Sequence, residues 1–229
     1  MRAERLDTRI RKDQIAQAAI QLIAARGLHA LSMAGLARQV GLVPSAIYRH
    51  VSGKAEVLDS MLEHLGRRLL SNVDMAAEDA EDPVERLHHL LVRHVRLIRG
   101  NPAIPRVIFS EGIFGNRPAR KAFLHGMITH YIDGIAGFIL EGQRAGRIRA
   151  EIDPRAAAVT FLGLILPGAV LWNMSDGEFD VTRQAARGWA IFRAGIEVPR
   201  GRGNAAPARG RTAAAAARGR GRAGKGGAT

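Results

Sequence analysis

Apolar residues recur at every third or fourth position through most of this chain. Their spacing matches one face of an α-helix, and no stretch shows the strict alternation of a half-buried strand. Glycine, proline and acidic clusters separate the apolar runs, as expected where helices begin and end. The pattern therefore predicts an all-α fold, with helices at residues 8–26, 33–40, 44–51, 54 to about 73, 83–99, 103–114, 117–146, 154–174 and 181–198.

The stretch SMAGLARQVGLVPSAIYRHVSGK, residues 32–54, contains two short helices joined by a tight turn. Ser32 precedes the first helix, where its side chain can cap a free backbone N–H. Gly41 follows that helix, at a position that favours a left-handed residue. Pro44 suits the first turn of the next helix, because its missing N–H would have no partner there. Two short helices joined in this way predict a helix-turn-helix.

The second helix of this motif has an apolar inner face and a polar outer face. Ile47 and Val51 are four residues apart and are expected to face inward. The outer face presents side chains that can hydrogen-bond to duplex DNA. They are Ser45, Tyr48, Arg49 and His50.

The block GLVPSAIYRHVSGK, residues 41–54, resembles the DNA-binding signature of the TetR family of bacterial regulators, which usually reads G-V-S-x-G-x-L-Y-x-H-F-x-S-K-E. Tyr48, His50 and Lys54 fall on matching positions, and the resemblance implies that they bind phosphates of the operator backbone. The chain departs from the signature at Val43, usually Ser or Thr, so that Pro44 alone must fix the start of the recognition helix. The motif context disfavours the alternative of an ordinary polar surface helix.

The resemblance is specific over residues 10–62 and only architectural beyond them. Ser45 occupies a position that is often Gly in the family, so the operator sequence cannot be taken from relatives. The residues predicted to form the DNA-binding surface are Ser32, Pro44, Ser45, Ala46, Tyr48, Arg49, His50 and Lys54. Three cations near the start of the first helix, Arg9, Arg11 and Lys12, either reach the DNA backbone or belong to a solvated helix end.

The charge of the chain is concentrated at its two ends. Of the net +13, residues 1–54 carry +6, residues 55–198 carry −1 and residues 199–229 carry +8. We interpret these three parts as a DNA-binding domain, a helical effector-binding and dimerisation domain, and a basic tail rich in Arg, Gly and Ala. The tail has almost no large apolar residue, which predicts disorder. It either follows DNA phosphates or serves only solubility.

Composition narrows the remaining possibilities. The chain has no Cys, which excludes disulfides, thiolate zinc sites and Cys nucleophiles. The first residues are too polar for a signal peptide, so we expect a cytoplasmic, nucleoid-associated protein. Residues 156–172 are apolar apart from Thr160, but this stretch is shorter than the roughly 20 residues that span a membrane, and Pro167 interrupts it. A buried core or interface helix is the favoured interpretation.

Nothing in the sequence supports an enzyme or a metal centre. There is no phosphate-binding loop and no Gly-x-Ser-x-Gly motif, and the histidines that share a helix are spaced so that they lie on different faces. We therefore predict no metal and no cofactor. A small-molecule pocket between the later helices is more plausible, since they supply apolar walls and a few polar groups. Its candidate residues are His94, Phe109, Ser110, Glu111, Phe123, Met127, His130, Tyr131, Phe161 and Asn173, with a solid core as the alternative.

The resemblance also implies a homodimer in which the last two helices of each chain form a four-helix bundle. Gly163, Gly168 and Gly188 would allow the helices to approach closely. The residues expected to fill the seam are Leu164, Leu171, Trp189 and Phe192. The sequence thus predicts a homodimeric transcriptional regulator, a repressor released from its operator by a small apolar effector. The alternative is a constitutive or architectural DNA-binding protein without an effector.

Overall fold

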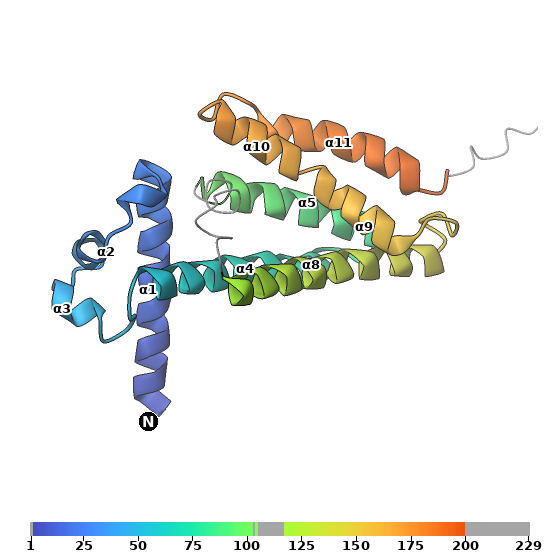
Figure 1. Cartoon of the computed structure of the whole chain (residues 1–229). Helices are drawn as coiled ribbons and strands as arrows, with labels where there is room; N and C mark the ends of the chain where they lie inside the picture. The colour runs from blue at the N-terminus through green and yellow to red at the C-terminus, as the bar shows by residue number, and fades with distance from the viewer. Residues whose placement is uncertain (1, 103, 105–116, 200–229) are drawn as a thin grey trace, which may run out of the picture. The chain divides into compact units, whose positions relative to one another are not determined.

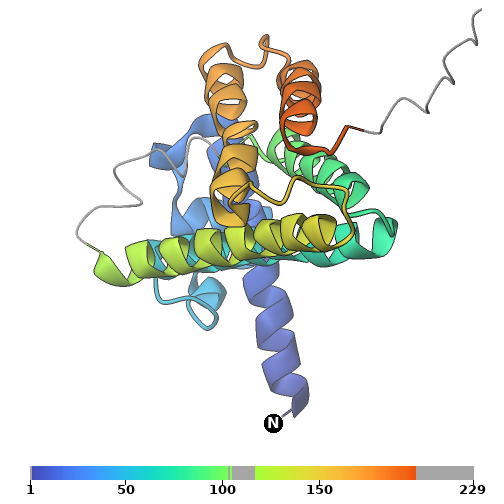
Figure 2. The same cartoon turned by 90° about the vertical axis from the view of Figure 1, so that its right-hand side faces the viewer.

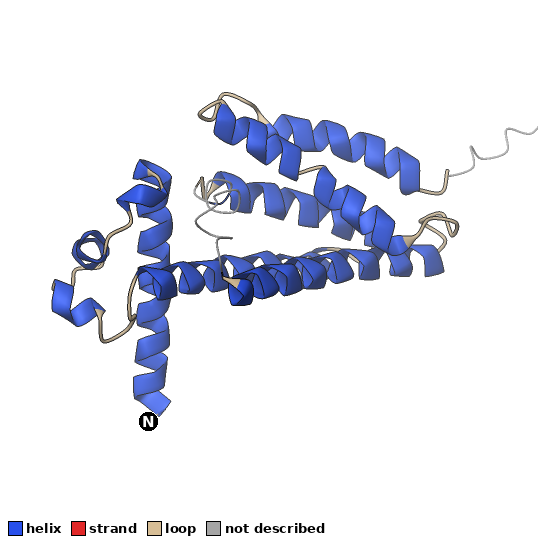
Figure 3. Ribbon diagram, in the orientation of Figure 1, coloured by secondary structure: helices blue, strands red, loops and turns tan. Residues whose placement is uncertain are grey.

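A computed structural model describes residues 2–102, 104 and 117–199 of the chain. Within these ranges the regular structure is helical, apart from one isolated antiparallel bridge between Ile148 and Glu197 (Figure 3). The all-α prediction is confirmed. The elements are α1 (Arg2–Arg26), the 3₁₀ helix η1 (Leu28–Ala30), α2 (Met33–Gln39), α3 (Pro44–Ile47), α4 (Lys54–Asp79), α5 (Pro83–Arg99), α8 (Pro118–Arg144), α9 (Pro154–Gly163), α10 (Leu166–Met174) and α11 (Val181–Ile196).

The helices form two packed groups, a head and a body, and α4 belongs to both. In the head, α1 crosses the start of α4 and packs against α2, which in turn contacts α3 (Figure 1). In the body, α4, α5 and α8 pack together, and α8 runs alongside α4 in both views (Figure 1 and Figure 2). The predicted apolar stripe of α1 is confirmed, because each of its members is buried. They are Ile15, Ala18, Ala19, Leu22 and Ile23.

Several helix ends follow the local signals in the sequence. Gly27 and Gly41 have φ values of 80° and 71°, the left-handed conformation that only glycine adopts without strain. The Asp82 side chain accepts a hydrogen bond from the Val84 N–H at 2.8 Å and caps α5. The expected end of α4 near residue 73 was too early, because the helix continues to Asp79. Asp79 is the last residue of α4, and its carboxylate accepts two hydrogen bonds from the Arg93 guanidinium of α5.

The stretch 154–174 is two helices, and the prediction of one continuous helix was wrong. The chain breaks at Leu164 and Ile165, where the Ile165 N–H bonds to the Leu162 carbonyl at 3.2 Å in a tighter turn. Pro167 stands in the first turn of α10. Proline cannot donate to the carbonyl four residues earlier, and its ring collides with that carbonyl, so the helix must restart there.

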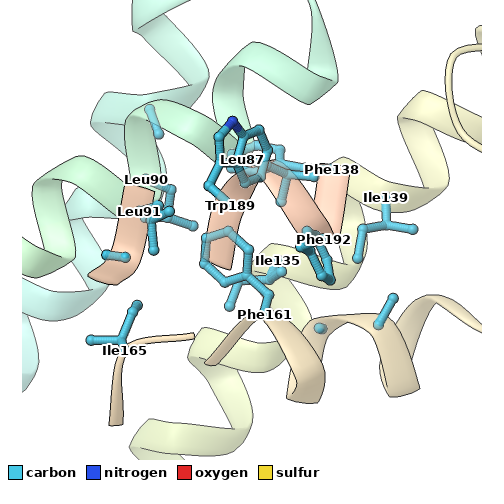
Figure 4. Close-up of a cluster of buried hydrophobic side chains, with 14 of the residues drawn as sticks. Leu87, Leu90, Leu91, Ile135, Phe138, Ile139, Phe161, Ile165, Trp189 and Phe192 are labelled. Atoms are coloured by element: carbon cyan, nitrogen blue, oxygen red, sulfur yellow. The ribbon is translucent and has the colours of Figure 1, made fainter. Parts of the chain in front are cut away.

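The core of the body gathers side chains from α5, α8, α9 and α11 (Figure 4). Trp189 and Phe192, which the sequence placed in a dimer seam, point into this core and are only 6% and 7% exposed. Their rings lie 6.5 and 5.7 Å from the ring of Phe161, centroid to centroid. The prediction of an interface role was wrong for both, because the apolar face of α11 packs into the core of its own chain.

Two stretches are long and apolar enough to cross a membrane by length and composition, α8 and residues Pro154–Met174. This is weak evidence, because core helices of soluble proteins meet the same criterion. The break before Pro167 divides the second stretch into helices of ten and nine residues. Neither piece reaches the roughly 20 residues that a span requires.

Candidate DNA-binding surface and effector groove

The turn between α2 and α3 is built as the sequence predicts. The Ser32 Oγ accepts a hydrogen bond from the Gly35 N–H at 3.1 Å and caps α2. The Leu42 N–H bonds to the Ala37 carbonyl at 2.8 Å and closes the turn. Ala37 is fully buried, and its small side chain lets the two helices approach closely. Ser32 therefore shapes the motif through its cap.

The second helix is shorter than predicted. Its α-helical part is α3, four residues long, and residues 48–50 continue as turns rather than as α-helix to Val51. In these turns the Arg49 N–H bonds to the Ala46 carbonyl at 3.2 Å and the His50 N–H to the Ile47 carbonyl at 3.0 Å. Such bonds to the third residue back belong to a tighter coil. The Val43 side chain makes no cap, so that Pro44 starts the helix unaided.

Two buried residues hold this segment against the head. Ile47 and Val51 lie in the head core, as predicted. Between them, the Tyr48 ring is 55% exposed. Ser45, Arg49 and Lys54 are exposed as well, whereas Ala46 and His50 are half-buried. The His50 Nδ1 is buried without a hydrogen-bond partner among the residues described. The exposed side of the segment thus offers hydroxyl groups and cations, which are the groups that contact DNA phosphates.

Glu56, in the first turn of α4, ties the head to the body. Its carboxylate accepts hydrogen bonds from the Lys12 Nζ of α1 at 2.8 Å and from the Ser52 N–H at 2.7 Å. The Lys12 bond, followed by the Ser52 bond, lowers the pKa of Glu56 to about 2. Lys12 is therefore engaged within the head, and the suggestion that it reaches the DNA backbone loses support. The side chain of Arg9 lies outside the described residues.

A second set of contacts joins α8 to the same turns of α4. Arg120 is a buried residue, and its Nε donates to the Asp59 carboxylate at 2.7 Å. One terminal nitrogen of its guanidinium donates to the Ala55 carbonyl at 3.2 Å. The start of α4 is therefore bonded to α1 through Glu56 and to α8 through Arg120.

The body has two neighbouring openings between α4 and α8. One, of about 510 Å³, is lined by Glu63, Gly66, Arg67, Leu70, Ala122, Phe123, Gly126, Met127 and His130. The other, of about 600 Å³, is lined by Asp59, Leu62, Glu63, Arg117, Pro118, Ala119, Arg120 and Phe123. Phe123 lines both, and we call the pair the α4–α8 groove. Three predicted effector residues, Phe123, Met127 and His130, come together here.

Other predicted effector residues lie elsewhere. His94 and Tyr131 are buried and joined by a hydrogen bond of 2.9 Å between Nδ1 and the hydroxyl oxygen, and Phe161 is fully buried in the body core. Burial lowers the pKa of His94 to about 4 and raises that of Tyr131. None of the three lines the α4–α8 groove, so the alternative of a solid core is favoured for them. Asn173 is half-buried on α10, also away from this groove.

The remaining candidates, Phe109, Ser110 and Glu111, fall outside the described residues. Sequence reasoning missed Gly66 and Leu70 of α4, and Arg120 of α8, which shape the groove. Arg120 stands in a charged segment that reads as a solvated helix start, so no local signal marks its burial. Among the residues that the structure describes, no group of three or more His, Asp or Glu side chains could hold a metal ion.

Two family models match the chain. Residues 15–61 match bacterial regulatory proteins of the tetR family, and residues 80–196 match the tetracyclin repressor-like C-terminal domain. The chain belongs to the TetR family. Its members are DNA-binding transcriptional regulators, typically homodimers and repressors. The family resemblance seen in residues 41–54 is confirmed.

Individual relatives are distant but cover most of the chain. The fatty acid metabolism regulator protein of Bacillus subtilis is 24% identical, over 73% of this chain and 86% of its own length. The nucleoid occlusion factor SlmA of Aliivibrio fischeri is 26% identical, over 82% of this chain and 96% of its own length. The crystal structure of FadR from Bacillus subtilis in complex with stearoyl-CoA has a TM-score of 0.67 and 22% identity, over 80% of this chain and 98% of that one. At this identity the structural likeness shows the shared TetR fold.

Proposed function

We propose that this TetR-family protein is a cytoplasmic repressor that binds operator DNA as a homodimer and is released by an acyl-CoA-type effector. The observation that carries the DNA-binding part is the segment held by buried Ile47 and Val51, which leaves Tyr48 exposed between them. Tyr48, His50 and Lys54 bind backbone phosphates and fix the register, while Ser45 faces base edges. In a two-fold dimer the two segments enter successive major grooves about 34 Å apart.

The dimer is proposed to form through the outer surface of α9, α10 and α11. The chain leaves five large apolar side chains exposed on these helices: Val159, Leu166, Leu171, Met174 and Ile191. Large exposed apolar side chains on neighbouring helices are typical of interaction surfaces. Of the four seam residues expected from the sequence, Leu171 keeps this role. Leu164 is half-buried, and a Cβ at Gly188 of α11 would lie 3.3 Å from it, so Leu164 packs within its own chain.

The effector is proposed to bind in the α4–α8 groove. Phe123, Met127 and Leu70 offer an apolar wall for an acyl chain, and Arg67 and His130 stand at its border. The structural relative FadR binds stearoyl-CoA, which supports an acyl-CoA-type effector for this chain. An occupant that separates α8 from α4 strains the Arg120 contacts with Asp59 and Ala55. It would thereby shift the population of α4 positions, and with it the spacing of the two heads.

The test measures binding of the full chain to duplex DNA by fluorescence anisotropy over a salt series, after the operator has been selected from random duplexes. Lys54→Ala should weaken binding evenly across sequences and reduce the slope of log affinity against log salt by about 0.9. Ser45→Ala should change the sequence preference instead. Arg144→Ala, at the exposed end of α8, is the control. Selection that yields no preferred sequence would refute operator recognition.

The effector is tested by adding stearoyl-CoA to the protein–operator complex. We expect release of the operator, and Met127→Glu, which places a charge on the apolar wall, should abolish the response while leaving operator affinity unchanged. The likeness to SlmA, a nucleoid occlusion factor, keeps a constitutive DNA-binding protein as the second candidate. Operator affinity that no acyl-CoA alters would favour that candidate.

A further inference from the structure

A separate opening lies between α4 and α5, with a volume of about 200 Å³. It is lined by Arg68, Ser71, Asn72, Met75, Arg93, Arg96 and Leu97. None of these residues lines the α4–α8 groove. Three arginines from two adjacent helices thus converge on a small volume, where like charges repel each other unless an anion accompanies them.

Of these arginines, Arg93 alone has an acidic partner among the residues that the structure describes. Arg93 donates two hydrogen bonds to the Asp79 carboxylate, at 2.8 and 2.9 Å. Arg68 and Arg96 are exposed, and their guanidinium groups have no ion pair or hydrogen bond with any residue that the structure describes. The opening is therefore lined by two positive charges, one from α4 and one from α5, that have no acidic partner among the described residues.

A further donor in the opening also lacks a partner. The Asn72 Nδ2 is buried and makes no hydrogen bond among the described residues. Leaving a buried donor unsatisfied costs free energy, so an acceptor at this position would be stabilising. Ser71 directs its hydroxyl proton to the Arg68 carbonyl at 3.1 Å, which leaves its oxygen free only to accept. Among the described residues that line the opening, the donor groups without a partner are thus two guanidinium groups and one buried amide.

We propose that this opening binds a phosphate group. A doubly charged oxyanion matches the two free guanidinium groups, whose planar forks bind phosphate through paired hydrogen bonds. A third oxygen can accept the bond from Asn72. A bound anion would touch residues of both α4 and α5 and so add a polar link between two helices that already pack together.

The phosphate is either free or part of an organic ester. A second opening, of about 560 Å³, shares Arg68 and is lined mainly by polar and small residues of α1 and of the turn after α5, among them Gln17, Gln21 and Asn101. An ester bound at Arg68 and Arg96 has room there for its organic part. Inorganic phosphate and 5′-AMP are therefore the two probes.

The experiment is calorimetric titration of the full chain with each probe, without DNA and at constant ionic strength, so that its outcome does not depend on the proposed function. Wild-type protein should bind at least one probe saturably. Arg68→Gln and Arg96→Gln should each weaken binding about tenfold, the loss expected for one charge-assisted hydrogen-bond partner. Asn72→Asp introduces a negative charge, which repels phosphate, at nearly constant side-chain shape, and it should weaken phosphate binding further.

Arg144→Gln is the matched control, since Arg144 is also an exposed helical arginine but lies at the end of α8. The basic segment at residues 199–229 is present in every variant, so its own affinity for anions contributes equally to all the measurements and does not affect the differences between variants. Equal affinity for both probes would assign the site to free phosphate, and tighter binding of 5′-AMP to an ester. The proposal is overturned if neither probe saturates, or if Arg144→Gln weakens binding as much as Arg68→Gln and Arg96→Gln.

Discussion

Trp189 and Ile191 are two residues apart on α11 but have opposite surroundings. Trp189 is almost fully buried and stacks on the His88 ring with a centroid distance of 5.3 Å. Ile191 is 76% exposed, on the surface that we propose for the dimer. Substitution of the first should therefore change the stability of the fold, and substitution of the second should change assembly.

The two effects have different magnitudes. Truncation of a buried tryptophan to alanine typically costs about 3–5 kcal/mol, so Trp189→Ala should lower the free energy of unfolding by about that amount. Full burial of an isoleucine side chain contributes about 1.5–3 kcal/mol, of which roughly three quarters, about 1–2 kcal/mol, is available at Ile191. A two-fold interface contains the residue twice. Ile191→Glu should thus weaken the dimer by about 2–4 kcal/mol, roughly 30- to 700-fold in dissociation constant.

Sedimentation equilibrium over a range of concentrations measures the dimer, and urea unfolding at one concentration measures stability. Val92→Glu provides the control, because Val92 is an exposed apolar residue of α5, outside the proposed interface. An Ile191→Glu protein that sediments as a dimer at the same concentrations as wild type would refute the proposed surface. A Trp189→Ala protein with unchanged unfolding free energy would refute the inward placement of that ring.

Three further predictions concern buried and shared polar groups. Tyr131→Phe removes the partner of the His94 Nδ1 and should lower the free energy of unfolding by about 1–3 kcal/mol in urea, so that an unchanged value would contradict the buried bond. The pKa of His94 is about 4 in the folded protein against an ordinary 6.5, so the unfolded chain takes up this proton first. Stability should therefore fall as pH drops from 6.5 to 4, by up to about 1.4 kcal/mol per pH unit, and His94→Gln should flatten that fall in a urea series. The pKa of Glu56 is about 2 in the folded protein against an ordinary 4.5. Its bond with Lys12 therefore contributes to the stability of the fold above pH 4.5, and this contribution is lost as pH falls towards 2. Glu56→Gln should thus lower the free energy of unfolding at pH 7 but not at pH 2.

The sequence by itself determined the helix-turn-helix, because its signals act over a few residues. The cap by Ser32, the left-handed Gly41 and the start at Pro44 each depend on local backbone geometry, and each appears in the structure. The inward placement of Ile47 and Val51 follows from helical periodicity in the same way. Local signals also set the start of α5 at Pro83.

Only the tertiary structure decided which surface each apolar stripe covers. Periodicity shows that Trp189 and Phe192 share a face of α11, but a core and a dimer seam both require such a face. The choice depends on where α5, α8 and α9 lie, and these helices are distant in sequence. The burial of Arg120 was equally hidden, because its partners Asp59 and Ala55 precede it by about sixty residues. Contacts at such separations leave no periodic trace in the chain, and they are the contacts that join the head to the α4–α8 groove.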